Sequence, residues 1–240
     1  TPFQDDIDTR RFGGLQRLYG VSGAQRIRQA HVVVVGIGGV GSWVAEALAR
    51  SGVARLTLVD MDHIAESNIN RQIHALTSTT GQAKVQAMRE RIALIHPACQ
   101  VDAIDEFVSP ENWPAVLPAQ PDAVVDACDQ VKAKVAMAQW ALASQVGFIT
   151  VGAAGGKRLA HKVDVDDLAH TTHDPLLAQA TRAFGEVLGR EYGDAMRAAI
   201  RKEAGIERNA EAIAGVRRQL TGASGNWDNE RSLDGTKLNG

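Results

Sequence analysis

Cysteine is almost absent from this chain, and its scarcity excludes several classes of protein. Only Cys99 and Cys128 occur among the 240 residues, and they form no C-x-x-C pair. A structural zinc site or a disulfide framework needs more cysteines at closer spacing. We therefore expect two reduced thiols, with Cys128 as a small buried hydrophobic residue rather than a nucleophile.

Long apolar runs and a strong net charge are lacking as well. No run approaches the roughly 20 apolar residues that cross a bilayer, and the first residues, TPFQDDIDTRRFGG, have no apolar core of a signal peptide. We therefore expect a cytoplasmic protein with no membrane segment. The formal charge of -2 gives no overall attraction to polyanions, so any contact with nucleic acid needs a local basic patch.

Strand patterns alternate with helical patterns along most of the chain. This order predicts an α/β, Rossmann-like, doubly wound and mainly parallel sheet with helices on both faces, plus a helical C-terminal segment. Strands are predicted at the two ends of 32–60 and at 101–105, 122–127, 148–151 and, as a short addition, 161–168; helices at 81–97 and 175–220. The predicted domains are an N-terminal helical arm (1–30), a Rossmann-like domain (31–170), a helical segment (171–220) and a disordered tail (221–240).

A glycine motif lies between the first strand and the helix that follows it. Gly36, Gly38 and Gly41 have the G-x-G-x-x-G spacing, in which backbone N–H groups and a helix N-terminus approach a phosphate. Asp60 follows at the distance where a carboxylate can hold a ribose hydroxyl. Alone, this motif predicts a nicotinamide dehydrogenase, although a lone match is a plain turn in roughly half of cases.

Polar and charged residues beyond Asp60 favour a different nucleotide chemistry. A polar segment contains Ser67, Asn68, Asn70, Arg71 and Gln72. Lys84 falls in the first turn of a predicted helix, where an ammonium opposes the helix dipole unless an anion lies nearby. Cleavage of ATP at the α-phosphate needs such cations, because charge develops on the departing pyrophosphate. Arg71 and Lys84 taken singly would be read as solvated surface charges.

Two carboxylates and a histidine need separate consideration. Asp126 and Asp129 lie at the C-terminal end of a predicted buried strand, where ligands bind open sheets. Either could hold magnesium, and Asp126 could instead cap the next helix. His74, inside the apolar run RQIHAL, is expected to be a hydrogen-bonded structural residue.

Taken together, these segments resemble a known family. GIGGVGSWVAEALARSGV, LVDMD, SNINRQIHAL, GQAKV and the D-x-x-D of DACD are similar to the ThiF, MoeB and HesA family of ubiquitin-activating-type adenylating enzymes. RFGGLQRLYG, NRQIHAL and the stretch from VGAAGGK to HDPL resemble its tRNA threonylcarbamoyladenosine dehydratase branch. The resemblance runs from about Arg11 to Leu177.

The resemblance implies a homodimer that binds ATP and magnesium and dehydrates threonylcarbamoyladenosine in tRNA through a carboxylate adenylate. A cysteine desulfurase or sulfur-acceptor protein is a further partner that it suggests. Relatives opening R-Y-x-R-Q send an arginine into the partner's ATP site; Gly14 stands at that position, so Arg11 or Arg17 is expected to take the role. The resemblance implies Arg71, Lys84 and Asp129 as catalytic residues and Asp129 as metal ligand. The expected nucleotide-binding residues are Gly36, Gly38, Gly39, Gly41, Asp60, Asp62, Ser67, Asn68, Asn70, Arg71, Gln72, Lys84, Asp126 and Asp129.

Three alternatives stay open at this point. The chain could adenylate the C-terminal carboxylate of a small ubiquitin-like or sulfur-carrier protein, although the missing C-x-x-C pairs argue against the zinc-bearing members that do so. It could be a nicotinamide oxidoreductase that uses the same glycine turn, or an inactive binding module. Product analysis and titration with ATP and NAD distinguish them.

Overall fold

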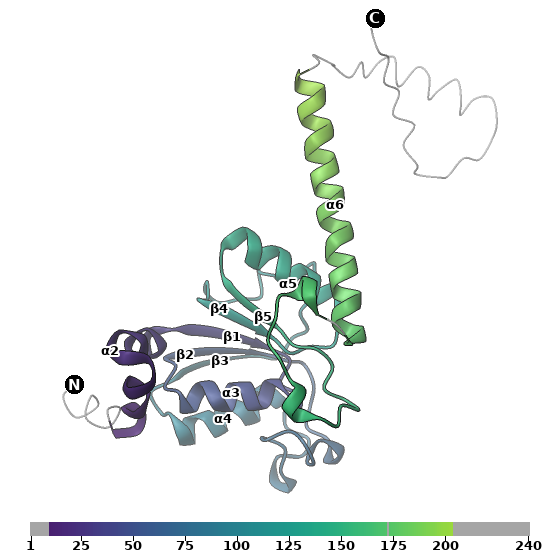
Figure 1. Ribbon diagram of the computed structural model, residues 1–240. Coiled ribbons are helices and arrows are strands. Elements are labelled where there is room, and N and C mark those ends of the chain that lie inside the picture. Colours follow the sequence, from purple (N-terminus) through teal and green to yellow (C-terminus); the bar gives the residue numbers. More distant parts are fainter. Residues whose placement is uncertain (1–9, 172, 204–240) are drawn as a thin grey trace, which may run out of the picture. The chain divides into compact units, whose positions relative to one another are not determined.

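The computed structural model describes residues 10–171 and 173–203, and it contains the predicted parallel sheet (Figure 1). The strands run in the order β3-β2-β1-β4-β5, and every neighbouring pair is parallel. Their bounds are β1 His31–Val35, β2 Arg55–Val59, β3 Gln100–Ile104, β4 Ala123–Asp126 and β5 Gly147–Thr150. The helices are α2 Gly14–Gln29, α3 Gly41–Arg50, α4 Lys84–Ile95, α5 Val131–Ser144 and α6 Pro175–Glu203. The predicted fold class is confirmed.

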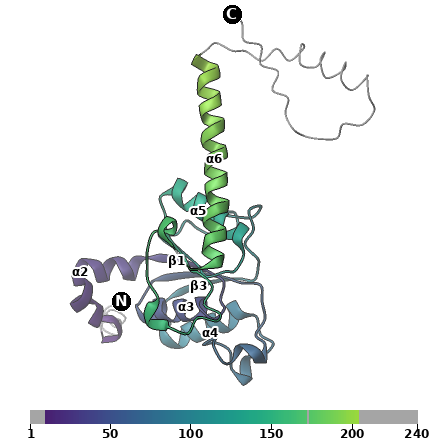
Figure 2. The same cartoon turned by 45° about the vertical axis from the view of Figure 1, so that its right-hand side comes forward.

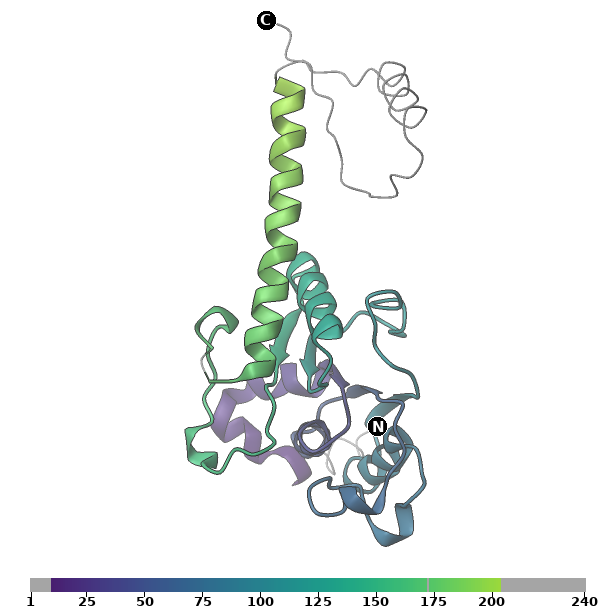
Figure 3. The ribbon, with the colours of Figure 1, turned by 90° about the vertical axis from the view of Figure 1, so that its right-hand side faces the viewer.

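Two hydrophobic clusters hold helices against opposite faces of the sheet, because side chains alternate along each strand. Val32 and Val34 of β1 pack into the cluster under α3 and α4, with Met88 and Ile92 of α4 at its centre. Val33 and Val35 face the other cluster, which contains Met137 of α5. Figure 3 shows the blue helices on one side of the strands and the teal α5 on the other.

The strand order places a ligand site between β1 and β4. From β1 the chain crosses outward to β2 and β3 and then returns to β4 on the other side, so the connections diverge at this point. A crevice opens at the carboxyl ends of the strands where such an order reverses. The glycine turn leaves β1 there.

The N-terminal arm lies at the opposite end of the sheet. Because α2 leads directly into the start of β1, it lies where the strands begin (Figures 1 and 2). Arg11 Nη1 donates to the carbonyl of Ile95, at the C-terminal end of α4. Lys84 begins the same helix, about 16 Å from Ile95 along the helix axis at about 1.5 Å per residue. Neither Arg11 nor Arg17 lines the pocket of its own chain, described below.

The predicted short strand at 161–168 is wrong. The structure has 3-10 turns at Ala160–Lys162 and Leu168–His170, with no strand between them. Asp164, Asp166 and Asp167 each accept a hydrogen bond from a backbone N–H one or two residues on. Such local bonds occupy the amides that a sheet ladder would need, so alternating valines do not suffice to make a strand.

The predicted C-terminal helix is present in its first part. It begins at Pro175, where Asp174 caps it by accepting from the N–H of Leu177 at 2.9 Å. The compact unit that carries the sheet ends at Glu186. Predictions for 204–220 and for the tail 221–240 lie outside the described residues, and the domain boundaries stay predictions. None of the described helices has the length and apolarity that a membrane span requires.

The glycine turn is packed too closely for side chains at two of its positions. A Cβ on Gly41 would lie 1.7 Å from the carbonyl oxygen of Gly36. Gly36 itself has φ +85°, and a Cβ there would lie 2.8 Å from the backbone of Ala127. Gly38 is different, since its nearest neighbour would be Gln72 at 4.0 Å. The motif therefore serves packing at its first and third glycines.

We expect Gly41→Ala to distort this turn, because the new methyl group meets backbone that cannot move aside. The melting temperature should fall by several degrees, as for other strained backbone substitutions. Gly38→Ala is the matched control, and thermal unfolding measures both. Equal melting temperatures for the two variants would contradict the steric argument.

Candidate functional site

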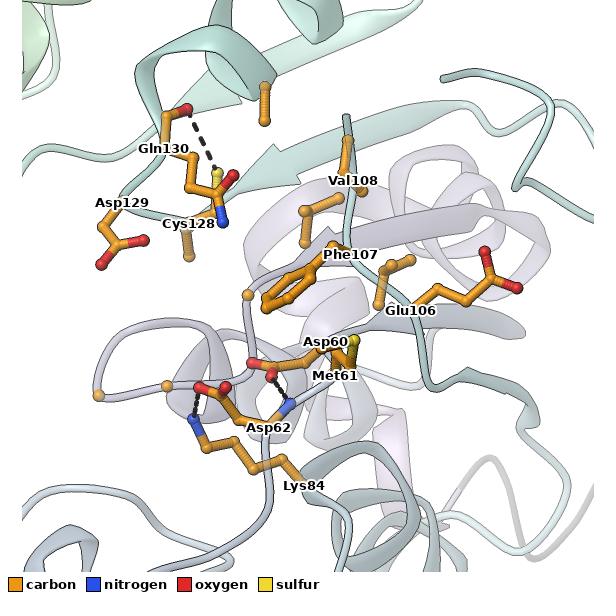
Figure 4. A pocket seen from close by; sticks show the side chains of 17 residues that line it. Asp60, Met61, Asp62, Lys84, Glu106, Phe107, Val108, Cys128, Asp129 and Gln130 are labelled. Carbon is orange, nitrogen blue, oxygen red and sulfur yellow. Dashed lines mark hydrogen bonds and ion pairs between the residues drawn. The ribbon is translucent and has the colours of Figure 1, made fainter. Parts of the chain in front are cut away.

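A pocket opens at the carboxyl ends of β1, β2 and β4, where the strand order predicts a ligand (Figure 4). Three groups of residues form its walls: the glycine turn, the segment after β2 with Lys84, and the segments after β3 and β4. The lining residues are Val35, Gly36, Gly38, Gly39, Val59, Asp60, Met61, Asp62, Lys84, Glu106, Phe107, Val108, Ala127, Cys128, Asp129, Gln130 and Ala133. The lining includes seven of the residues predicted to bind nucleotide: Gly36, Gly38, Gly39, Asp60, Asp62, Lys84 and Asp129.

Asp60 connects the glycine turn to the end of β2. Its Oδ2 accepts from the N–H of Ile37 at 2.6 Å, and its Oδ1 accepts from the N–H of Asp62 at 2.8 Å. Burial raises the pKa of this carboxyl, while the two N–H groups and Lys84 oppose the change. Each oxygen keeps acceptor capacity, so Asp60 can hold a ribose hydroxyl while it fixes the turn.

Lys84 is the ammonium that reaches the pocket. Its side chain is buried and forms an ion pair of 2.7 Å with Asp62, whose own side chain is 60% exposed. An antiparallel bridge between His63 and Ala83 holds the two segments together. The helix dipole disfavours an ammonium at this first turn of α4, and Asp62 compensates. An incoming phosphate could replace that exposed carboxylate as the partner.

Arg71 lies beside the glycine turn without lining the pocket. Its Nη1 donates to the carbonyl of Ser67 at 2.8 Å and to Asn70 Oδ1 at 2.9 Å. A Cβ on Gly39 would lie 3.5 Å from its Cδ. Asn68 is used locally, accepting from the N–H of Ala65. This polar segment therefore forms a compact turn with the guanidinium next to the expected phosphate position.

The two aspartates after β4 separate into different environments. Asp129 lines the pocket, whereas Asp126 is fully buried and bonded to Lys134 Nζ at 3.0 Å and Thr150 Oγ1 at 2.7 Å. Asp126 also accepts from the N–H of Cys128 at 3.1 Å, but it does not cap the next helix, because α5 has Gln130 as its N-cap and no side chain bonds there. We therefore remove Asp126 from the proposed nucleotide ligands and keep Asp129. The described residues contain no group of three or more metal-ligating side chains.

Two buried side chains, Gln72 and His74, have polar atoms with no hydrogen-bond partner among the described residues. Gln72 is buried, and its Oε1 accepts no hydrogen bond among the described residues. His74 is 2% exposed, and the structure gives neither ring nitrogen a partner within the described residues. The prediction of a hydrogen-bonded histidine is therefore wrong for the ring, which is buried among the described residues without a bond to either nitrogen. Burial, with Lys84 and Arg91 nearby, lowers the pKa of His74 to about 4.

Several pocket residues were not predicted from the sequence. Met61 and Phe107 are large apolar side chains that stay 44% and 47% exposed, and they line the pocket next to Asp60 (Figure 4). Flat apolar surfaces of this kind suit a nucleobase. Cys128 also lines the pocket, but burial raises the pKa of its thiol to about 12, so it is protonated and unsuited to attack.

Comparison with known proteins identifies the family. The sequence matches the ThiF family over residues 12–180. The chain belongs to the ThiF family. The tRNA threonylcarbamoyladenosine dehydratase of Haemophilus influenzae is 47% identical over 183 residues, which cover 76% of this chain and 69% of that protein. The enzyme of the same name from Escherichia coli is 45% identical and covers 72% and 65%. The chain thus spans about two thirds of the length of these relatives.

Solved structures agree with this assignment. The Escherichia coli dehydratase crystallised in complex with ATP is 44% identical, with a TM-score of 0.72, and the match covers 75% of this chain and 74% of that one. ThiF-family membership confirms the expectation drawn from the NRQIHAL and GQAKV segments. The dehydratase relatives give no support to the alternative of a nicotinamide dehydrogenase.

His74 gives the folded protein a stability that depends on pH. Its pKa is about 4 when folded and 6.5 when unfolded, so the unfolded state binds a proton first as the pH falls. The stabilisation is present above pH 6.5 and is lost progressively between pH 6.5 and 4. We expect about 2 kcal/mol less stability at pH 5 than at pH 7 from this group.

Urea unfolding of the wild type and of His74→Met at both pH values isolates this contribution, since other groups titrate alike in both proteins. The variant should lose less stability between pH 7 and pH 5. Equal losses in the two proteins would show that His74 does not titrate as described.

Proposed function

We propose that this ThiF-family protein uses ATP to dehydrate threonylcarbamoyladenosine in tRNA, through an adenylate of the substrate carboxylate. The observation that carries the proposal is the placement of Lys84 and Asp62 beside the glycine turn, with Asp129 on the opposite wall. Relatives at 47% and 45% identity carry the dehydratase name, and a solved relative holds ATP. The described residues offer no activated thiol, and this route needs none.

The chemistry follows from the poor leaving ability of a carboxylate oxygen. A carboxylate oxygen of the substrate attacks the α-phosphate of ATP, and pyrophosphate leaves. The carbamoyl group then closes onto the activated carbonyl, and AMP departs in place of hydroxide. The protein positions these groups and offsets charge. In this scheme Lys84 exchanges Asp62 for a phosphate, and Arg71 forks onto phosphate oxygens beside Gly39.

The charges of the pocket support a need for additional cations. Four carboxylates line it, from Asp60, Asp62, Glu106 and Asp129, and Lys84 supplies the one ammonium among the lining residues. A triphosphate entering alone would be repelled. Magnesium fits this donor set, because it is usually bound through one or two carboxylates plus substrate phosphates. Asp129 would hold the ion, which would offset phosphate charge when bound.

The need of the pocket for additional cations also supports a homodimer, in which an arginine of one copy reaches the site of the other. Arg11 and Arg17 lie at the far end of the sheet from their own pocket, so either could reach only the site of a second copy. A cytoplasmic location stays a prediction from the lack of long apolar runs. A sulfur-transfer partner, either a cysteine desulfurase or a sulfur acceptor, stays a prediction from the resemblance.

Nucleotide product analysis tests the proposed function directly. With tRNA bearing threonylcarbamoyladenosine, ATP should be converted to AMP and pyrophosphate, and unmodified tRNA should give none. Formation of ADP would contradict the proposal. Exchange of pyrophosphate into ATP that depends on a carrier protein ending in Gly-Gly, and not on tRNA, would favour the alternative adenylating function.

Arg71→Ala and Lys84→Ala should each lower turnover by about 10²-fold or more, as losses of groups that stabilise developing charge do. Both should keep the fold, because Arg71 is exposed and loss of Lys84 leaves Asp62 solvated. Arg89→Ala, an exposed arginine on α4, is the control. Melting far below the wild type would instead assign these residues a structural role.

A further inference from the structure

Lys134 is a fully buried cation whose role the proposed chemistry does not explain. Among the described residues it is the largest side chain that is fully buried, with 1% of the side chain exposed. Its three ammonium protons match three acceptors: Asp126 Oδ2 at 3.0 Å, Thr150 Oγ1 at 3.2 Å and the Val151 carbonyl at 3.0 Å. A buried ammonium needs such complete pairing, so its geometry is fixed.

Through Asp126 this cation reaches one wall of the nucleotide pocket. Asp126 Oδ1 accepts from the N–H of Cys128 at 3.1 Å, which sets the backbone of the segment Ala127 to Gln130. All four residues of that segment line the pocket, and Figure 4 shows Cys128, Asp129 and Gln130 facing Asp62 and Lys84 across it. The segment thus takes its position from a buried pair behind it.

The same wall touches the glycine turn. A Cβ on Gly36 would lie 2.8 Å from the carbonyl carbon of Ala127 and 2.9 Å from the N–H nitrogen of Cys128. The N–H of Ala127 donates to the carbonyl of Val35 at 2.8 Å. A shift of Asp126 would therefore move Asp129 and the turn relative to each other.

Stability alone does not account for a pair of this kind. A buried ion pair is often replaced by apolar residues at no cost in stability, so its presence is weak evidence that the fold needs it. We propose that Lys134 is a positioning residue for the nucleotide, which holds Asp126 and thereby fixes the Ala127 to Gln130 wall against the glycine turn. The proposal rests on the proposed function, in that ATP is the nucleotide used to test it.

The experiment measures the ATP dissociation constant, kcat and KM of Lys134→Met, below the melting temperature of every variant. Displacement of a positioned group by about 1 Å can cost about 10²-fold in rate, so kcat should fall by about that factor and ATP should bind at least several-fold more weakly. Lys134→Arg keeps a cation and should recover at least a tenth of wild-type kcat.

Arg91→Met is the matched control, because it breaks a second pair with a buried partner away from the pocket. Arg91 Nε bonds Glu46 Oε2 at 2.7 Å, and the Glu46 side chain is 6% exposed. This variant should lower the melting temperature but keep ATP affinity and kcat within about twofold of wild type. If Lys134→Met does not fold, the double variant Asp126→Asn, Lys134→Met takes its place under the same criteria.

Two results would overturn the proposal: a folded Lys134→Met or double variant with wild-type ATP affinity and kcat, or losses in Arg91→Met as large as those in Lys134→Met. Failure of the proposed function is distinguishable from both. If the proposed function fails, the wild type binds ATP but forms no AMP. The ATP dissociation constants of the variants then decide the role of Lys134.

Discussion

The close packing of the glycine turn is the constraint on which the site depends. With no Cβ at Gly41, the turn closes until the helix backbone lies against the carbonyl of Gly36. Two neighbours fix this turn from either side, since Asp60 bonds the N–H of Ile37 and the backbone of Ala127 abuts Gly36. The ends of β2 and β4 are thereby placed at set distances from the start of α3.

Two lysines on opposite walls illustrate how burial decides the role of an ion pair. Lys134 and Asp126 are both fully enclosed, so neither charge can leave without exposing the other to an apolar surrounding. The side chain of Lys84 is also buried, but that of its partner Asp62 is 60% exposed. That pair can open, because water solvates the carboxylate that is released. One pair therefore suits a fixed support and the other a ligand-exchange site.

The sequence predicted the groups that follow local rules and missed those that depend on distant contacts. Spacing and the helix dipole act within a few residues, so the sequence predicted the strand before the glycine turn, the turn itself and Lys84 at the start of a helix. The burial of Asp126 was not, since Lys134 lies eight residues on and Thr150 comes from the next strand. The available signal of a buried partner was Lys134, which stands between Ala133 and Val135 in the mainly apolar segment VKAKVAMAQW.

The error at 161–168 arises because strand periodicity describes side chains and does not count backbone amides. At the glycine turn, by contrast, the N–H of Ile37 bonds the distant Asp60. Asp164, Asp166 and Asp167 supply acceptors close to their own amides, so the segment has no need of a neighbouring strand. Patterns of apolar residues therefore predict strands less well where short carboxylates alternate with them.

The glycine turn alone leaves the identity of the nucleotide open, because backbone amides bind a diphosphate and a triphosphate alike. The electrostatics of the remaining walls separate the two. A pocket lined by four carboxylates and one ammonium disfavours any polyphosphate that arrives without cations, and the penalty grows with phosphate charge. Each cation that accompanies a triphosphate therefore contributes more here than at a neutral site. This electrostatic balance can give specificity for a nucleotide that arrives with its cations, because carboxylates that bind a cation no longer repel the phosphates.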